Sequence, residues 1–470
     1  MNKFYLTTTL PYVNAEPHIG FALEIIQADA TARLHRLLGD EVFFNFGTDE
    51  HGQKIYEAAL KNNQTPKEYC DEYAAKFDAL KNALNLSYNS FIRTTDPHHE
   101  MAAQEFWKRC KANDDIYKKQ YQIKYCVGCE LEKTDSELVD GKCPLHPNKE
   151  LEIREEENYF FRFSKYQAPL LAFYKDHPEF VIPATKYKEI TTFVEGGLQD
   201  FSISRLKSKM PWGIPVPDDE EHVMYVWFDA LVNYISAIGW PDDMEKFNTW
   251  WPVTQFAGKD NLRQQSAMWQ AMLMSAGVPA SKQIFIHGFL TLNGQKISKS
   301  LGNTINPIEV AEQYGTDVLR YYLLAKVNPW DDSDISMKKL EEVYTSDLAN
   351  GLGNLVARVA KLCEKVSLDG QKLPEEVIPG ITEHLQKYLY NEALTLLWEK
   401  ISEVDKQINA DTPWKLEGDQ LAEKLREYIH EILVISYSLQ PFLPETAEKI
   451  INQFTAEKIT SSQALFPRLS

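Results

Sequence analysis

The sequence predicts an α/β protein with a parallel sheet, an insertion within that sheet and an all-helical C-terminal region. Residues 3–10 are β-branched and aromatic, residues 19–38 carry apolar side chains at helical spacing, and residues 40–46 again have the composition of a strand. A strand, a helix and a strand in this order form a parallel α/β unit. This pattern is interrupted near residue 117, and only helical patterns follow residue 334.

The interrupted stretch, which ends near residue 217, is rich in turn residues, cysteines and charge. Strand-like segments resume at Met224–Phe228 and continue at Gln255–Gly258 and Gln283–His287. We therefore expect one sheet domain that is split by an inserted domain. The predicted bounds are 1–116 and 223–337 for the two halves of the sheet domain, 117–222 for the insertion and 338–470 for the helical region.

The last region predicts a bundle of long helices. Lys338–Val366 forms one continuous helical pattern, and Leu421–Leu439 forms another that ends before Pro441. Proline ends such a pattern because it has no backbone N–H to continue the helix. Between these two helices, four residues define the apolar face of a further helix: Leu385, Leu389, Leu396 and Ile401.

Composition places the chain among ordinary globular proteins. Of its 470 residues, 44% are hydrophobic and 25% are charged. It has no apolar run of about 18 residues, as a membrane span would need, and residues 1–12 lack the apolar core of a secretory signal, which predicts a cytoplasmic location. The net charge of −18 argues against a surface that grips duplex nucleic acid, although the local field at a docking surface matters more.

A histidine and a glycine, His18 and Gly20, stand where the first helix should begin. A helix N-terminus presents free N–H groups and positive potential, and an imidazole there can donate to a phosphate oxygen. Glycine leaves room for a flat adenine. Far downstream, the glycine-bounded loop GQKISKSLGN carries Lys296 and Lys299, which could neutralise a leaving pyrophosphate. Each segment alone is more often a cap or a solvated loop, but together they predict a nucleotide clamp.

Four residues of the insertion have the spacing C-x2-C-x13-C-x2-H: Cys126, Cys129, Cys143 and His146. Two short chelating turns that face each other make a closed tetrahedral site, which is typical of structural zinc. Such an ion would hold together a small insertion that lacks its own core. We expect one structural zinc ion at 126–146, with no catalytic role, and reduced cysteines as in the cytoplasm.

Five segments follow one another along the chain as TTTLPYVNAEPHIGF, FNFGTDEHGQKI, YVWFDALVNY, HGFLTLNGQKISKSLGN and DLANGLGNLVARV. In them, PHIG and KISKS resemble the two nucleotide signatures of class I aminoacyl-tRNA synthetases. All five together resemble the methionyl-tRNA synthetase family over nearly the whole chain. The resemblance implies a Rossmann-like parallel-sheet catalytic domain, split by a zinc-knuckle insertion and followed by an all-α anticodon-binding bundle.

The resemblance also implies a ligase that uses ATP, with magnesium, to activate methionine and then transfers the methionyl group to tRNA(Met). Catalysis would consist of positioning and charge stabilisation. It assigns the catalytic step to His18, Gly20, Lys296 and Lys299. It places ATP against His18, Gly258, Asp260, His287, Gly288, Leu290 and Lys299. It places methionine against Leu10, Tyr12, Asp49, Trp227, Ala230, Leu231, Tyr234, Asn261, Gln265 and Trp269. It places the anticodon against Asn354, Arg358 and Trp414.

Three positions depart from the family pattern. Phe21 replaces the second signature histidine, while Asn261 and Gln265 replace an isoleucine-like residue and a histidine of the methionine pocket. Losing one phosphate donor would lower the rate by roughly 10- to 100-fold. The alternatives are a paralogue that binds ATP or tRNA without charging it, and a ligase for a related amino acid or homocysteine. The chain ends soon after the bundle, without the dimerising domain appended in some relatives, which predicts a monomer.

Overall fold

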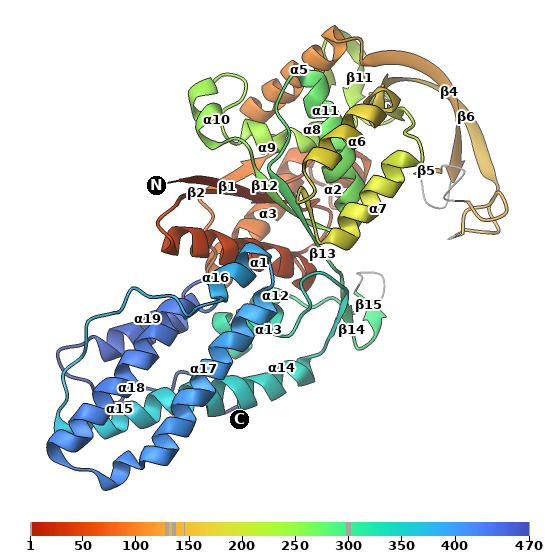
Figure 1. Cartoon of the computed structure of the whole chain (residues 1–470). Coiled ribbons are helices and arrows are strands. Elements are labelled where there is room, and N and C mark those ends of the chain that lie inside the picture. Colours follow the sequence, from red (N-terminus) through yellow and green to blue (C-terminus); the bar gives the residue numbers. More distant parts are fainter. Residues whose placement is uncertain (1, 127–130, 134–137, 145, 298–301, 470) are drawn as a thin grey trace.

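In the computed structural model, the chain folds around a six-stranded parallel sheet (Figure 1). The structure describes residues 2–126, 131–133, 138–144, 146–297 and 302–469. The strand order is β3-β2-β1-β12-β13-β7. The strands are β1 (Lys3–Thr8), β2 (Glu41–Thr48), β3 (Ser90–Arg93), β7 (Val181–Ile182), β12 (Thr254–Gly258) and β13 (Gln283–His287).

Two hydrophobic cores form on the two faces of this sheet, because successive side chains of a strand point to opposite faces. In β1, Phe4 and Leu6 join one core and Tyr5 joins the other. The first half of the sheet domain contributes α1 (Ile19–Leu37), α2 (Gln53–Lys61), α3 (Pro66–Asp78), α4 (Leu80–Ala83) and α5 (Pro97–Ala112). The second half contributes α8 (Val226–Leu231), α9 (Asn233–Ser236), α10 (Met244–Trp250), α11 (Trp269–Ala276), α12 (Pro307–Tyr314) and α13 (Thr316–Ala325).

One predicted strand, Met224–Phe228, is wrong after its first residue. The strand β11 (Asp219–Met224) ends at the first of these residues, and the helix α8 begins at Val226. Short apolar runs do not distinguish a buried strand from a buried helix, and this run is one of them. The predicted strand at Gln283–His287 is confirmed as β13.

In the described residues of the segment predicted as an insertion, the chain forms two small antiparallel sheets and two α-helices. The same segment supplies the edge strand β7 of the main sheet. A long hairpin of β4 and β6 extends away from the main sheet (Figure 1). One sheet contains β4 (Ile116–Cys126), β5 (Leu131–Lys133), β6 (Leu151–Phe161) and β8 (Phe201–Ser202). The other contains β9 (Ser204–Leu206), β10 (Pro215–Val216) and β11 (Asp219–Met224). The helices are α6 (Gln167–Asp176) and α7 (Ala184–Glu195).

A three-stranded sheet precedes the helical region and contains β14 (Leu290–Leu292), β15 (Gln295–Lys296) and β16 (Ser333–Ile335). The continuous helix predicted at Lys338–Val366 is confirmed, with a π-helical segment in its middle. Its parts are α14 (Met337–Val343), η6 (Tyr344–Gly353) and α15 (Asn354–Val366). The other helices are α16 (Ile381–Gln386), α17 (Tyr390–Asp411), α18 (Gly418–Leu439) and α19 (Pro444–Phe454).

The apolar face that was predicted as one helix is divided between two. Leu385 lies in α16, and Leu389 lies before α17, which begins at Tyr390. The buried residues of α17 recur at helical spacing, as an amphipathic helix requires, and are Tyr390, Ala393, Leu394, Leu397, Ile401, Val404 and Ile408. In the part of the chain that the structure describes, no helix combines the length and the apolar composition needed to cross a bilayer.

A buried arginine joins the helical region to the sheet domain. Arg320 of α13 is fully buried and lies 2.8 Å from the carboxylate of Asp29 in α1. Its guanidinium also donates to the carbonyls of Pro441 and Phe442, which connect α18 to α19. A buried charge is stable only when it is paired and hydrogen-bonded, as this one is. The bundle is therefore fixed directly against the helix that begins at the predicted nucleotide site.

Candidate active site

The predicted site lies where the strand order of the parallel sheet reverses. β1 pairs with β2 on one side and with β12 on the other. Ligands of open parallel sheets bind beyond the carboxyl ends of the strands at such a point. After β1, the N–H of Thr9 donates to the carbonyl of Phe256 in β12, and the carbonyl of Pro11 accepts from Asp49 after β2. The chain after β1 therefore bridges the ends of both neighbouring strands.

His18 caps the first turn of α1. Its backbone is extended, with φ −131° and ψ 169°, and its Nδ1 accepts a hydrogen bond from the N–H of Gly20 at 3.1 Å. Because Nδ1 accepts, the ring proton lies on Nε2, which is then the donor. Burial lowers the pKa of His18, which favours this neutral form. A Cβ on Gly20 would lie 2.9 Å from Cε1 of His18, so the glycine makes room for the imidazole itself.

Phe21 has packing partners that explain its presence in structural terms. Its ring centroid lies 4.3 Å from that of His18, and it meets Phe77 of α3 edge-on at 5.6 Å. Aromatic pairs of this kind stabilise a fold by about 0.5–1.5 kcal/mol beyond their burial. Phe21 therefore ties the first turn of α1 to α3 and supports the ring of His18.

A buried ion pair joins the middle of α1 to the end of β13. Nε2 of His287 lies 2.9 Å from Glu24, and its Nδ1 lies 2.8 Å from the carbonyl oxygen of Gly288. Burial lowers the pKa of His287, but the Glu24 carboxylate and the carbonyl outweigh burial, and the pKa is raised. The other Glu24 oxygen accepts from Thr9 at 2.8 Å (N) and 2.6 Å (Oγ1). The charged pair thus connects three elements of the predicted ATP site.

Two glycines of the predicted ATP site lie close to other parts of the chain, and the backbone contact at Gly288 leaves no room for a Cβ. A Cβ on Gly258 would lie 2.9 Å from Oδ1 of Asp260, and a Cβ on Gly288 would lie 2.1 Å from the backbone carbon of Asp331. Leu290 is 7% exposed and belongs to the main core. These positions therefore have a structural reason that does not depend on a nucleotide.

The lysine loop is described only in part. Lys296 lies in β15, whose backbone pairs with β14, and Lys299 lies outside the described residues. After the loop, the carbonyl of Ile305 accepts from the N–H of Ile19 at 3.0 Å. The segment that follows KISKS therefore contacts the first turn of α1, one residue from His18.

The residues predicted to bind methionine come from several elements around the same strand ends. Tyr12 pairs with Asp49 in an isolated parallel bridge. Trp269 is fully buried, stacks on Phe106 at 5.4 Å and meets Tyr234 edge-on at 5.9 Å. The remaining positions are Leu10 after β1, Trp227, Ala230 and Leu231 in α8, and Asn261 in a 3-10 turn, Lys259–Asn261.

Gln265, which departs from the family pattern, belongs to a buried chain of hydrogen bonds. Nε2 of Gln255 donates to Oε1 of Gln265 at 2.8 Å, and Nε2 of Gln265 donates to the hydroxyl oxygen of Tyr234 at 2.7 Å. Gln265 lies in a π-helical turn, Gln264–Met268, and such turns are frequent at functional sites. Because the Tyr234 oxygen accepts here, its own proton remains for another acceptor.

Two buried carboxylates lie close to Tyr12. Oδ1 of Asp49 and both carboxylate oxygens of Asp229 have no hydrogen-bond partner among the described residues. The nearest cation for Asp229 is His51, whose Nδ1 lies 3.5 Å away. Burial, followed by the charge of Asp229, raises the pKa of Asp49 well above its ordinary value. Buried carboxylate oxygens without hydrogen bonds are costly, so this arrangement favours a cationic ligand that can donate to them.

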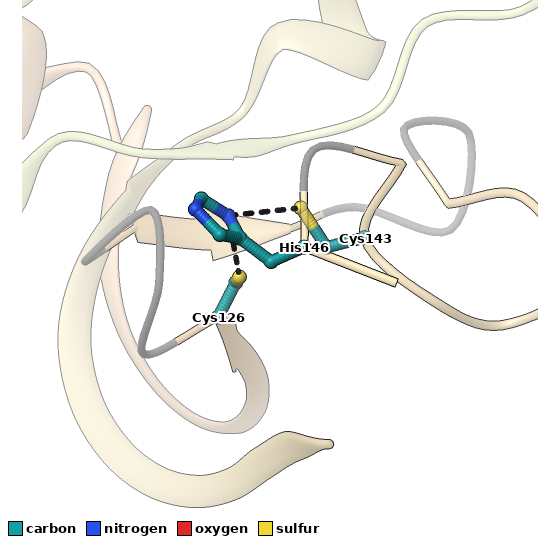
Figure 2. Close-up of side chains that lie close together, drawn as sticks. All are labelled: Cys126, Cys143 and His146. Atoms are coloured by element: carbon teal, nitrogen blue, oxygen red, sulfur yellow. Dashed lines mark hydrogen bonds between the residues drawn. The ribbon is translucent and has the colours of Figure 1, made fainter. Parts of the chain in front are cut away.

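Three of the four predicted metal ligands lie together in the insertion. Figure 2 shows the sulfurs of Cys126 and Cys143 beside one ring nitrogen, Nδ1 of His146, at 3.8 and 4.0 Å. The three ligand atoms lie within 4.8 Å of one another. Ligand atoms around a tetrahedral zinc ion are about 3.5 Å apart, so the group fits such an ion. The fourth predicted ligand, Cys129, lies outside the described residues.

The residues predicted to read the anticodon lie in the bundle. Asn354 is exposed at the start of α15. Arg358, one turn later, donates to Asp405 at 2.6 Å and to Asn409 at 3.0 Å. Both partners lie near the end of α17, which leads into a short turn that carries Trp414. The indole of Trp414 is 46% exposed, as a base-stacking platform requires.

Sequence reasoning missed Glu24, Asp229, His51 and Gln255. All four are polar residues that the structure buries. Polar side chains inside a buried segment need partners, so their position within such segments was the available signal. Their partners could not be found in this way, because Glu24 and His287 are 263 positions apart.

Comparisons with known proteins agree with this arrangement. A family model described as tRNA synthetases class I (M) matches residues 4–151 and 147–360. The methionine–tRNA ligase of Thermosynechococcus vestitus is 43% identical over 96% of this chain and 89% of its own length. The methionine–tRNA ligase of Thermotoga maritima is 42% identical over 98% of this chain and 77% of its own length. The Mycobacterium tuberculosis methionyl-tRNA synthetase, solved with methionyl-adenylate, has a TM-score of 0.88 and 35% identity, covering 100% of this chain and 99% of that one.

The parallel sheet, the nucleotide signatures at its switch point and the helical bundle define a class I aminoacyl-tRNA synthetase. Identities above 40% extend over nearly the full length of this chain. Within the class, the chain belongs to the methionine–tRNA ligase family.

Proposed function

We propose that the chain charges tRNA(Met) in two steps. Methionine reacts with ATP to give methionyl-adenylate and pyrophosphate, and the methionyl group then passes to tRNA with release of AMP. The observation that carries this proposal is the contact between the first turn of α1, at Ile19, and the segment after the KISKS loop, at Ile305. This contact supports a common site for His18 and the lysine loop, in a chain that is similar to methionine–tRNA ligases over nearly its full length.

In the activation step, an oxygen of the methionine carboxylate attacks the α-phosphorus and the bond to pyrophosphate breaks. Negative charge then develops on the phosphate oxygens, and Nε2–H of His18 would donate to one of them. The bond from Gly20 holds the imidazole in the required tautomer. Lys296 and Lys299 would balance the charge of the leaving pyrophosphate. Magnesium bound with ATP would add further charge neutralisation.

The amino-acid site would recognise both ends of methionine. The α-ammonium would pair with the buried carboxylate of Asp49, whose Oδ1 has no hydrogen-bond partner within the described part of the chain. The free proton of the Tyr234 hydroxyl would donate weakly to the thioether sulfur. Aromatic rings at Tyr12, Trp227 and Trp269 would enclose the side chain, since sulfur packs well against ring edges.

We propose that Cys126, Cys129, Cys143 and His146 hold one structural zinc ion. The convergence of two sulfurs and one ring nitrogen within 4.8 Å supports this proposal. A closed site of four protein ligands has no position for substrate. The ion would therefore cross-link the end of the β4–β6 hairpin and would take no part in the chemistry.

We propose that Asn354, Arg358 and Trp414 recognise the anticodon. Amide and guanidinium groups read base edges, and an exposed indole stacks on an unpaired base. The half-exposed Trp414 and the short path from Arg358 through α17 support this proposal. Recognition of unstacked bases also needs less positive charge than gripping a duplex, which is compatible with the net charge of −18.

The test is ATP–pyrophosphate exchange with purified protein, magnesium and each of the twenty amino acids and homocysteine in turn. We expect exchange with methionine. Exchange only with another amino acid would show that the specificity is changed, and Asn261 and Gln265 in the altered pocket would be the first candidates for the cause. No exchange from folded, zinc-loaded protein would favour a non-catalytic paralogue. A cytoplasmic monomer stays a prediction, and light scattering of the eluted protein tests its oligomeric state.

A further inference from the structure

Trp212 comes from the inserted part of the chain, between β9 and β10, and contacts the loop that follows Asp49. Its indole Nε1 donates to the carbonyl oxygen of Glu50 at 2.6 Å. Its own carbonyl accepts from the N–H of Gly52 at 3.1 Å, and its ring lies 5.6 Å from that of His51. One residue of the insertion therefore contacts the three residues that directly follow the predicted ammonium ligand.

The sheet domain holds the beginning of the same loop. The N–H of Asp49 donates to Pro11 at 3.0 Å, and the carbonyl of Asp49 accepts from Val13 at 3.2 Å. The carboxylate of Glu50 accepts from both Nε and a terminal nitrogen of Arg93, at 2.6 and 2.9 Å. The sheet thus fixes the backbone of Asp49 and the side chain of Glu50, while Trp212 fixes the backbone after them.

The end of the loop has little freedom to compensate for a lost contact. Gly52 has φ 113°, a conformation that other residues rarely adopt. A Cβ at this position would lie 2.7 Å from the hydroxyl oxygen of Tyr12. The bond between Trp212 and Gly52 is therefore made beside a second residue of the predicted methionine pocket. A shift of the loop would move Tyr12 as well as Asp49.

We propose that Trp212 is a positioning residue of the amino-acid site. It acts through the backbone of Glu50 and Gly52 and holds Asp49 and Tyr12 in one geometry for the ammonium group. Trp212 belongs to the insertion, so docking of the insertion onto the sheet domain completes the amino-acid site. The contacts reported above for His18 and Gly20 on α1 are made with other residues than 49–52. This inference rests on the proposed function, because its effect is on methionine binding.

The test compares Trp212→Phe, which keeps an aromatic ring but loses the indole N–H, with the wild type in ATP–pyrophosphate exchange. The matched control is Trp398→Phe in the bundle, where the indole N–H also donates to a backbone carbonyl, that of Asp347. Losing one such hydrogen bond changes an equilibrium by about 3- to 10-fold. We expect the KM for methionine to rise by about this factor in Trp212→Phe only, with the KM for ATP unchanged.

Hydrogen exchange of the peptide that contains residues 48–52 provides a second measurement on the folded protein. We expect faster exchange in Trp212→Phe than in the wild type without methionine, and a smaller difference with saturating methionine. An equal rise in both KM values, a fall in kcat alone, or unchanged exchange of this peptide would overturn the inference. An inactive wild type would instead refute the proposed function, so the two failures are distinguishable.

Discussion

Replacement of Gly20 by alanine should lower activity without lowering stability. A Cβ at this position would lie 2.9 Å from Cε1 and 3.1 Å from Nδ1 of His18, about 0.4–0.6 Å inside the ordinary contact distance of about 3.5 Å. The imidazole would have to move by at least this distance and would lose its bond from the Gly20 N–H. Displacement of a catalytic group by about 1 Å can cost about 100-fold in rate. We expect kcat for ATP–pyrophosphate exchange to fall by roughly 10- to 100-fold.

The effect on stability should be small because two contributions oppose each other. Alanine is favoured over glycine within a helix by about 0.5–1 kcal/mol, and the lost capping bond costs about as much. Gly351→Ala is the matched control, since the nearest atom to its Cβ would be 3.5 Å away and it lies in the bundle. A Gly20→Ala protein that keeps more than half of the wild-type kcat would refute the role of His18 as the positioned phosphate donor. Thermal melting tests whether the stability of Gly20→Ala is unchanged.

The other predictions concern the zinc site, the buried ion pair and the anticodon. Cys143→Ser should reduce the zinc content, measured by elemental analysis, from about one ion per chain to near zero; an unchanged content would exclude this cysteine as a ligand. The pKa of His287 is raised, so its pairing with Glu24 contributes its full stabilisation below about pH 6.5, the pKa of an unfolded histidine. This stabilisation is lost as the pH rises through the raised pKa of the folded protein. The melting temperature of His287→Gln should therefore fall further below the wild type at about pH 6 than at about pH 9, and an equal difference would contradict a charged His287. Arg358→Ala should raise the KM for tRNA in aminoacylation by about 10-fold, since a base contact contributes about 1–3 kcal/mol, while leaving ATP–pyrophosphate exchange unchanged; a matching loss in exchange would point to misfolding instead.

Much of the fold could be predicted because its elements have simple local patterns. The strand at Gln283–His287 and the helix from Ile19 are found where apolar residues and their spacing place them. The prediction failed at Met224–Phe228, where the run is apolar throughout and carries no period. The π-helical segment of the long helix was not predicted, because its buried residues Tyr344, Leu348 and Leu352 recur every four positions, a spacing that an α-helix also allows.

The candidate site was predicted unevenly for a related reason. Residues within recognisable motifs, such as His18, were found from the sequence, whereas their supports were not. Gly20 is an example, because the sequence did not show that the ring of His18, two residues away, occupies the space where a Cβ would lie. The contact of Trp212 with the loop after Asp49 spans 162 positions and two parts of the chain. Such contacts depend on the tertiary fold and have no local signature.

The altered positions have partners that a working ligase and a non-catalytic paralogue would share. Phe21 packs on Phe77, and Gln265 uses both ends of its amide, yet stability alone would select such partners in either case. The two buried carboxylates, whose oxygens lack hydrogen bonds among the described residues, are more informative. Selection for stability alone would replace Asp49 or Asp229, because a buried carboxylate without a hydrogen-bond partner is costly. Their presence together, beside the end of β2 where methionine is expected, is explained if a cationic group binds there and supplies the missing partner.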